Sequence, residues 1–254
     1  MSQLVFKNAK VLFGGCDLSA NLNQVDCTVG AKMVDDNVFG DTSESYVAGL
    51  ISTSIDVTGY WDAVLTGNPD GADNTLFPAV GVDDKLISVF PDGYTEGTLT
   101  DQGIGLLSTL ASYTPINGKH GELLGLKAKA AARGLPLRAI PLKNSTTAFA
   151  GTGTGTKFNI GNLSASQYLY AGLHVIGYTG TAPTLDMLIQ SDTDASAGGE
   201  VTRITFAQVG QATGGFYATR LAGPVTAPWW WAKWTVGGSA SPGYKFLVWM
   251  AIGA

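Results

Sequence analysis

Charged side chains are scarce in this chain. They make up 14% of its 254 residues, whereas ordinary soluble proteins carry about a quarter. Hydrophobic residues reach 45% and aromatic residues 10%, which excludes a disordered chain. A monomer with so few charges would have a poorly hydrated surface. We therefore expect other subunits to cover part of that surface.

Basic residues are also in the minority, with 15 Lys and Arg against 20 Asp and Glu. The net charge of -5 excludes the basic patch that a nucleic-acid reader needs. An acidic wall still suits a conduit that nucleic acid passes without binding, because like charges repel.

Cysteine and histidine are rare, with two of each. A disulfide between Cys16 and Cys27 is geometrically possible, but two reduced, half-buried thiols are the favoured interpretation. No zinc site fits their spacing to His120 and His174, so we predict neither metal nor cofactor. We interpret His174 as a strand residue with a satisfied ring rather than a general base. No catalytic pattern is present, and we expect no enzyme.

Long apolar runs are missing. The N-terminus has no continuous apolar core of signal-peptide length, and nowhere do eighteen apolar residues follow one another. We therefore expect no secretion signal and no helix that spans a membrane.

Two stretches imitate known binding loops but fail their requirements. In residues 151–158, Thr156 stands where a phosphate-binding loop needs its second glycine. In residues 192–203, a calcium loop would need glycine in place of Ala197 and a carboxylate in place of Arg203. We interpret them as a linker and an acidic turn.

Alternation with a period of two dominates the chain and predicts a mainly β fold. The clearest strand covers residues 51–61, and we also interpret 122–134 as a strand. Helices are predicted at 82–93, where Asp83 can cap, and at 100–113. The Gly/Thr/Ser-rich residues 144–156 are predicted to be a linker. The predicted fold is two antiparallel β-sandwich or barrel domains, residues 1–143 and 157–254, with one or two short helices.

Four tryptophans lie within six residues, at positions 229–234. In a strand, Trp230 and Trp234 share one face while Trp229 and Trp231 share the other. One pair fills a core, and the other must be covered by something else: a second domain, a neighbouring subunit, a sugar or a lipid. Residues 246–252, which include Trp249, are apolar on both faces too. This pattern favours a protein contact over a sugar platform, a membrane belt or nucleic-acid stacking. We predict an oligomer interface at Trp229, Trp231 and Trp249.

Residues 39–62 carry a family resemblance. Their sequence, FGDTSESYVAGLISTSIDVTGYWD, is similar to a stretch common in tail tube proteins of long-tailed bacteriophages, in which an F-G-D-T element leads through A-G-L into an alternating strand. Within it we expect Leu50, Tyr60 and Trp61 to anchor the strand in the core. The segments between residues 172 and 238 resemble the second half of longer virion proteins of this kind.

The resemblance implies a non-enzymatic structural subunit of a virion, made in the host bacterial cytoplasm. Members form rings, usually hexameric, or trimers when two tube-like domains are fused. The rings stack into a tube whose channel holds the tape-measure protein and passes DNA without sequence-specific binding. No membrane is involved. Two alternatives remain at this point: a carbohydrate-binding β module on a virion or cell surface, and a capsid decoration protein.

Overall fold

The computed structural model describes residues 8–38, 42–62, 71–97, 102–145, 147–196 and 198–253. Regular structure is almost entirely β, and every pair of neighbouring strands is antiparallel. The helical elements of these residues are α1 (Ala72–Leu76) and the 3-10 turn η1 (Phe77–Ala79). The predicted mainly β fold with a short helix is therefore confirmed.

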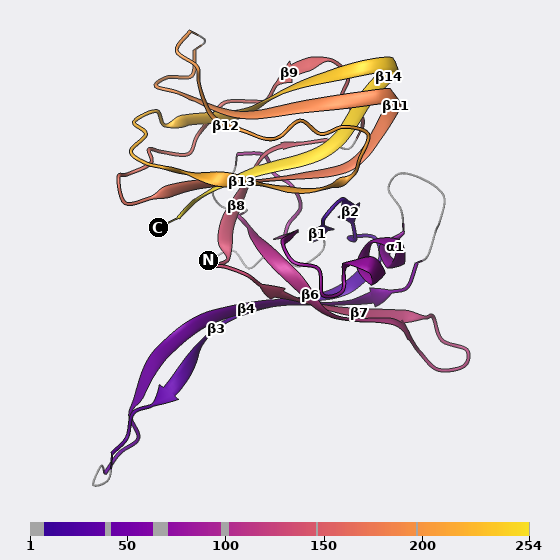
Figure 1. Ribbon diagram of the computed structural model, residues 1–254, viewed down its shortest axis with the longest axis vertical. Coiled ribbons are helices and arrows are strands. Elements are labelled where there is room, and N and C mark those ends of the chain that lie inside the picture. The colour runs from indigo at the N-terminus through magenta and orange to yellow at the C-terminus, as the bar shows by residue number, and fades with distance from the viewer. Residues whose placement is uncertain are drawn as a thin grey trace.

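The lower part of the molecule in Figure 1 contains the first strands and α1. Its core alternates along the strands, as the sequence predicted: in β4, Thr53, Ile55 and Val57 are buried while the residues between them are not. The strands of this part are β1 (Lys10–Phe13), β2 (Cys16–Asp17), β3 (Leu22–Asp35), β4 (Tyr46–Tyr60), β5 (Lys85–Phe90), β6 (Gly103–Asn117) and β7 (Gly125–Ala132).

The upper part is built around two strands of 25 residues each, β11 (Tyr168–Asp192) and β14 (Trp229–Gly253). They pair along their whole length and bend together at a corner where the register shifts. Gly180 and Gly238 lie at this corner with positive φ, and a Cβ on Gly180 would be 2.7 Å from the Cα of Pro242. The shorter strands are β9 (Thr152–Thr154), β10 (Phe158–Asn159), β12 (Val201–Thr205) and β13 (Gly214–Ala222).

Strand β8 (Leu137–Asn144) joins the two parts, as Figure 1 shows. Its first residues pair with β6 and its later residues pair with β14. A buried cluster fills the seam beside it, with side chains from both parts: Leu12, Leu86, Phe90, Ala139, Leu247, Trp249 and Ala251. Each part therefore has its own core, and the two parts share this third cluster.

The two predicted helices are wrong, because residues 82–93 contain β5 and residues 100–113 contain most of β6. Five of the six residues of β5 are buried. A strand that is buried on both faces lacks the alternation that would distinguish it from the apolar face of a helix. In β6, Gly105 lies against the Trp249 ring. The strand predicted at 122–134 is confirmed by β7.

Residues 144–156 run along β14 rather than away from the protein. The backbone N–H of Ser145 bonds the carbonyl of Phe246 at 2.9 Å, and that of Gly155 bonds the carbonyl of Ala232 at 2.8 Å. Division of the chain into two domains at this segment stays a prediction. Cys16 and Cys27, both within the described residues, are thiols with no disulfide between them. Cys16 is buried and Cys27 half-buried.

Candidate assembly interface

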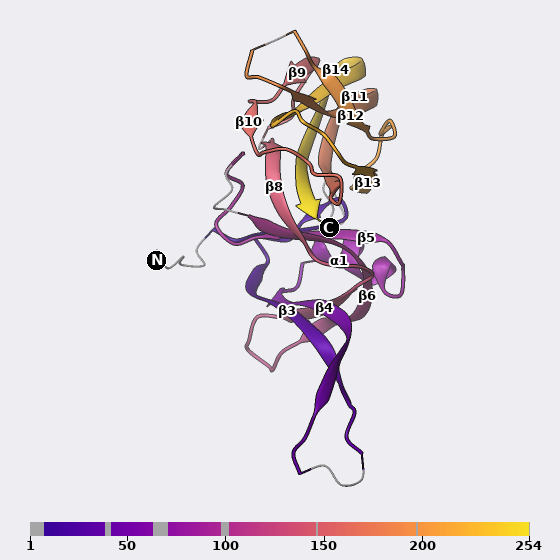
Figure 2. The ribbon, with the colours of Figure 1, turned by 90° about the vertical axis from the view of Figure 1, so that its left-hand side faces the viewer.

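The hairpin of β3 and β4 leaves the body of the protein. Its two strands pair from Leu22 and Gly59 near the body to Asp35 and Tyr46 near the tip. Strand β7 joins β4 only from Ser54 to Tyr60. Beyond that point no third strand of the described residues pairs with either strand. Residues 28–38 and 42–53 are thus a two-stranded ribbon that projects from the lower part, as Figures 1 and 2 show.

The ribbon exposes large apolar side chains on both faces. Leu50 is 87% exposed, and Ile51, on the opposite face, is 56% exposed. A two-stranded hairpin is marginally stable alone in water, and its open edges are templates for pairing with other chains. We infer that another polypeptide covers this ribbon. Its other large exposed apolar side chains are Val29, Met33, Val34, Val38, Tyr46 and Val47.

Polar contacts order the ribbon near its tip. Asn37 donates its backbone N–H to Asp35 at 2.9 Å and accepts the N–H of Ser45 at 2.6 Å. The Tyr46 hydroxyl donates to Glu44 at 2.8 Å, and this hydrogen bond raises the pKa of Tyr46. These hydrogen bonds therefore fix the conformation of residues 35–37 and 44–46, which lie next to the tip.

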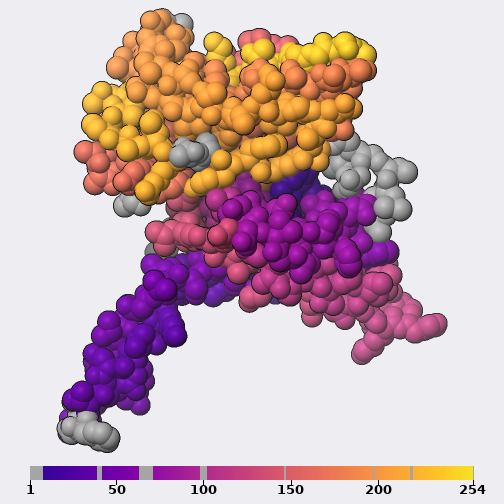
Figure 3. Space-filling view, in the orientation of Figure 1, coloured from indigo at the N-terminus to yellow at the C-terminus, as the bar shows by residue number. Residues whose placement is uncertain are grey.

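A second apolar projection lies at the other end of the same sheet, where β6 turns into β7. Ile116 is 63% exposed, Leu123 75% and Leu124 43%. Figures 1 and 3 show the two projections extending to opposite sides of the lower part. A contact between different patches of two copies is head-to-tail and generates rings if it closes.

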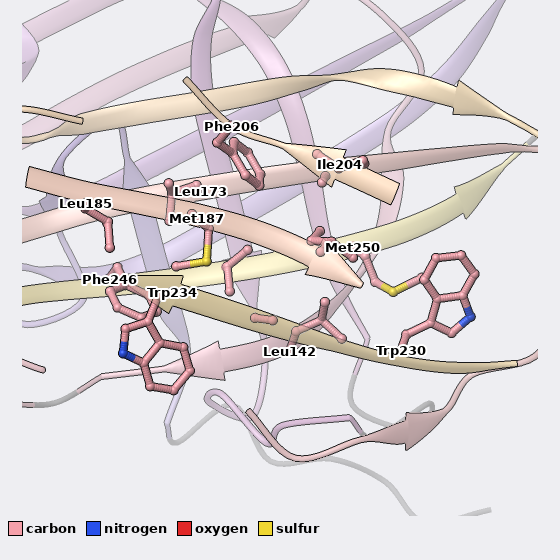
Figure 4. Close-up of a cluster of buried hydrophobic side chains, with 14 of the residues drawn as sticks. Leu142, Leu173, Leu185, Met187, Ile204, Phe206, Trp230, Trp234, Phe246 and Met250 are labelled. Carbon is pink, nitrogen blue, oxygen red and sulfur yellow. The ribbon is translucent and has the colours of Figure 1, made fainter. Parts of the chain in front are cut away.

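Two of the four clustered tryptophans, Trp230 and Trp234, lie in a buried core. Trp230 and Trp234 belong to the main cluster of the upper part, with Phe246, Met187 and Met250 nearby (Figure 4). The Trp230 indole N–H donates to the carbonyl of Gly161 at 2.8 Å.

The other face of this strand is covered from within the chain. Trp231 is 1% exposed, because Lys157 lies above it with Nζ 4.3 Å from the ring centroid. Trp249 is fully buried at the seam between the two parts. These two residues therefore need no outside partner for cover, and the interface role predicted for them stays a prediction. An interface role stays a prediction for Trp229, which is half-buried.

The expected core anchors in β4 also need correction. Leu50 and Tyr60 are exposed, at 87% and 46%, because the sheet provides no cover at either position. Trp61 is half-buried and packs against the lower core. The exposed ribbon itself was missed, since its strands alternate in the same way as buried ones. Phe39, Gly40 and Asp41, which open the resembling stretch, lie outside the described residues.

Lys157 links Trp231 to a buried carboxylate. Its Nζ lies 3.6 Å from Asp192, which is 3% exposed, and donates to the carbonyl of Ser196 at 2.5 Å. We expect Lys157→Ala to uncover the Trp231 ring, which should shift tryptophan emission to longer wavelength and increase quenching by acrylamide. Lys129→Ala, which removes an exposed ion pair with Asp56, is the matched control. Identical spectra for both variants would contradict this role.

His174 is completely buried, and both ring nitrogens are bonded, as the sequence predicted. Nε2 lies 2.9 Å from the Ser88 hydroxyl and Nδ1 2.8 Å from the carbonyl of Gly14. The contacts join β11 of the upper part to the lower part. Ser88 is also fully buried, so this serine–histidine pair has no surface at which a substrate could meet it.

Burial lowers the pKa of His174 from 6.5 to about 4, against the opposing effects of the Gly14 carbonyl and Asp17. The unfolded chain then binds a proton between these values that the folded chain does not. This contribution to stability is complete above pH 6.5 and is lost as the pH falls to about 4. We expect it to amount to about 3 kcal/mol.

Urea unfolding of the wild type and His174→Gln at several pH values measures this contribution. The difference in free energy of unfolding between the wild type and His174→Gln should shrink toward pH 4. The control His120→Gln, in an exposed loop, should keep the wild-type dependence of this free energy on pH. A parallel pH dependence in wild type and His174→Gln would exclude His174 as the cause.

Metal and membrane signals are absent from the described part of the chain. No group of three metal-ligating side chains gathers there. None of the helices in those residues has the length and hydropathy required to cross a membrane.

Comparison with known proteins gives distant structural matches. No protein-family model matches the chain, and no curated protein matches it. The virion of a native gene transfer agent particle contains a chain with 16% identity and a TM-score of 0.36, over 50% of this chain and 92% of that one. The crystal structure of the SPP1 Dit protein, described as a hub of the adsorption apparatus of phages that infect Gram-positive bacteria, has 11% identity over 98% and 100%, with a TM-score of 0.38. A chain of the activated phage p2 baseplate has 9% identity over 98% and 99%, with a TM-score of 0.30. These TM-scores are too low to carry a functional assignment.

Proposed function

We propose that this chain is a structural subunit of a bacteriophage tail, and specifically a tail tube protein whose copies form rings stacked around a DNA channel. The observation that supports the proposal best is the ribbon of residues 28–38 and 42–53. It projects from the body with apolar side chains on both faces and two open edges. Such an element needs a neighbouring polypeptide to be stable.

A second copy of this chain is the partner that the geometry favours. The ribbon and the β6–β7 tip are different patches at opposite ends of one sheet, and a head-to-tail contact between them can close into a ring. The resemblance to tail tube proteins covers residues 39–62, which include β4, the strand of this ribbon that β7 joins near the body. Hexamers, or trimers of two-domain subunits, are the ring sizes that this resemblance implies.

The charge of the ribbon agrees with a wall beside transiting DNA. Among residues 28–53 of the sequence, the one basic residue, Lys32, is opposed by four acidic residues: Asp35, Asp36, Asp41 and Glu44. Such a wall repels the phosphate backbone instead of holding it. We propose that the acidic side chains Asp35, Asp36 and Glu44 face the channel, where DNA passes and the tape-measure protein lies without sequence-specific contacts, while the apolar side chains of the ribbon contact the neighbouring copy.

Negative-stain microscopy of the purified chain tests the proposal. We expect rings, and at high concentration tubes with a regular axial repeat. Monomers that persist at high concentration would contradict it and would favour the carbohydrate-binding module. Closed shells or particles bound only to capsids would favour a decoration protein.

A further inference from the structure

A pocket of about 340 Å³ opens at the seam between the upper and lower parts. This volume is at the lower end of the range for small-molecule sites and suits a ligand of one ring. Its lining combines an apolar floor, two tyrosines and two arginines: Leu106, Leu107, Leu137, Tyr170, Tyr217, Arg133 and Arg220. The proposed ring assembly does not use any of these residues.

The two arginines are in different electrostatic states. Arg133 lies 2.9 Å from Asp84 and 3.4 Å from Asp83, so carboxylates of the protein offset its charge. Arg220 is exposed, and no carboxylate of the described residues forms an ion pair with it. Arg220 therefore presents a cation at the pocket for which the described residues supply no carboxylate counter-charge.

Aromatic rings hold Arg220 in place. Its guanidinium lies 4.1 Å from the ring centroid of Tyr168, and the neighbouring Tyr170 raises the pKa of Arg220. The Tyr170 and Tyr217 centroids are 6.5 Å apart, and Tyr217 in turn packs edge-on against Trp249 at 6.5 Å. The cation is thus positioned beside a wall of tyrosine rings that the buried core supports.

The hydroxyl of Tyr217 is a hydrogen-bond donor at neutral pH, because burial raises its pKa further above the ordinary value of 10.0. Tyrosine rings with hydroxyl groups complement a ligand that has an apolar face and a polar rim. A sugar ring has this character, with C–H groups on its faces and hydroxyl groups at its edge. The guanidinium fork of Arg220 matches a carboxylate or phosphate oxygen pair.

We propose that this pocket binds a single saccharide unit that carries an anionic group, either a carboxylate or a phosphate. The sugar face packs on Tyr170 and Tyr217, and the anionic group pairs with Arg220. The site is distinct from the tryptophan cluster at residues 229–234, none of which lines this pocket. It does not depend on the assembly of copies.

Ligand-observed NMR titration of the full chain with glucuronate, glucose 6-phosphate and glucose tests the proposal. We expect one or both anionic sugars to bind at least about tenfold more tightly than glucose, since a charge-assisted hydrogen bond contributes about 1.5–3 kcal/mol. Arg220→Gln should remove that preference. Arg138→Gln, at an exposed position on β8 outside the pocket, should leave it unchanged.

Tyr217→Phe provides a second variant, because it keeps the ring and removes the hydroxyl. We expect weaker binding of all three sugars with the anionic preference retained. Tighter binding of glucuronate or of glucose 6-phosphate identifies which anionic group the site takes. The proposal is overturned if none of the three sugars binds, if glucose binds as tightly as the anionic sugars, or if Arg220→Gln retains the preference.

Discussion

Leu50→Asp is expected to abolish assembly and to leave the subunit folded. The side chain is 87% exposed in the single chain, and surface substitutions usually change stability by less than about 0.5 kcal/mol. In the assembly we propose, the same position is covered by a neighbour, and an unpaired carboxylate buried there costs several kcal/mol. A cost of about 3 kcal/mol at each contact weakens it by roughly two orders of magnitude. Analytical ultracentrifugation should then find monomers where the wild type forms rings.

Two further variants test whether the loss of assembly is specific to the ribbon or follows from an Asp at any exposed apolar position. Val201→Asp changes a 44% exposed residue on β12 of the upper part, and we expect normal assembly. Leu123→Asp changes the 75% exposed tip between β6 and β7, and we expect a loss comparable to that of Leu50→Asp. Assembly of Leu50→Asp at wild-type concentrations would exclude the ribbon as the interface. Normal assembly of Leu123→Asp alone would exclude this tip as the surface that receives the ribbon.

Alternation predicted which face of β4 is apolar. It did not predict the residue beyond which no other strand pairs with β4 and the apolar face is exposed. Alternation places Ile51 on the same face as Ile55, and the structure buries Ile55 while Ile51 is 56% exposed. The difference arises because β7 stops pairing at Ser54. Strand pairing over long sequence separation leaves no mark in a local pattern, so the projecting ribbon could not be found from periodicity.

The tryptophans illustrate the complementary problem. Alternation correctly separated Trp230 from Trp231, yet could not distinguish cover by another subunit from cover by the same chain. Lys157, which covers Trp231, comes 74 positions earlier. The prediction of a helix at β5 was wrong for a related reason, because a strand buried on both faces loses its alternation. What remained predictable was local, namely the strand periodicity of β4 and β7.

Trp249→Ala is expected to destabilise the protein by about 3–5 kcal/mol, the usual cost of removing a buried tryptophan. The ring belongs to the cluster that joins the two parts, so its loss affects both. It lies against two glycines, Gly105 on β6 and Gly172 on β11. A Cβ on Gly172 would be 2.4 Å from two atoms of the indole, and one on Gly105 would be 2.5 Å from the indole. Gly172→Ala should therefore cost about 1–3 kcal/mol or more through overpacking.

A double-mutant cycle shows whether the indole is the cause of that cost. Trp249→Phe removes the ring atoms that the Gly172 Cβ would meet, so Gly172→Ala in this background should cost less than about 1 kcal/mol. The coupling energy should then exceed the value of roughly 0.5 kcal/mol within which distant sites add. Urea unfolding at concentrations where the chain is monomeric measures all four proteins. Gly30→Ala, whose Cβ would meet nothing within 4 Å, is the matched control and should be close to neutral. Equal costs of Gly172→Ala in both backgrounds would mean that backbone conformation, and not the Trp249 ring, requires glycine at this position.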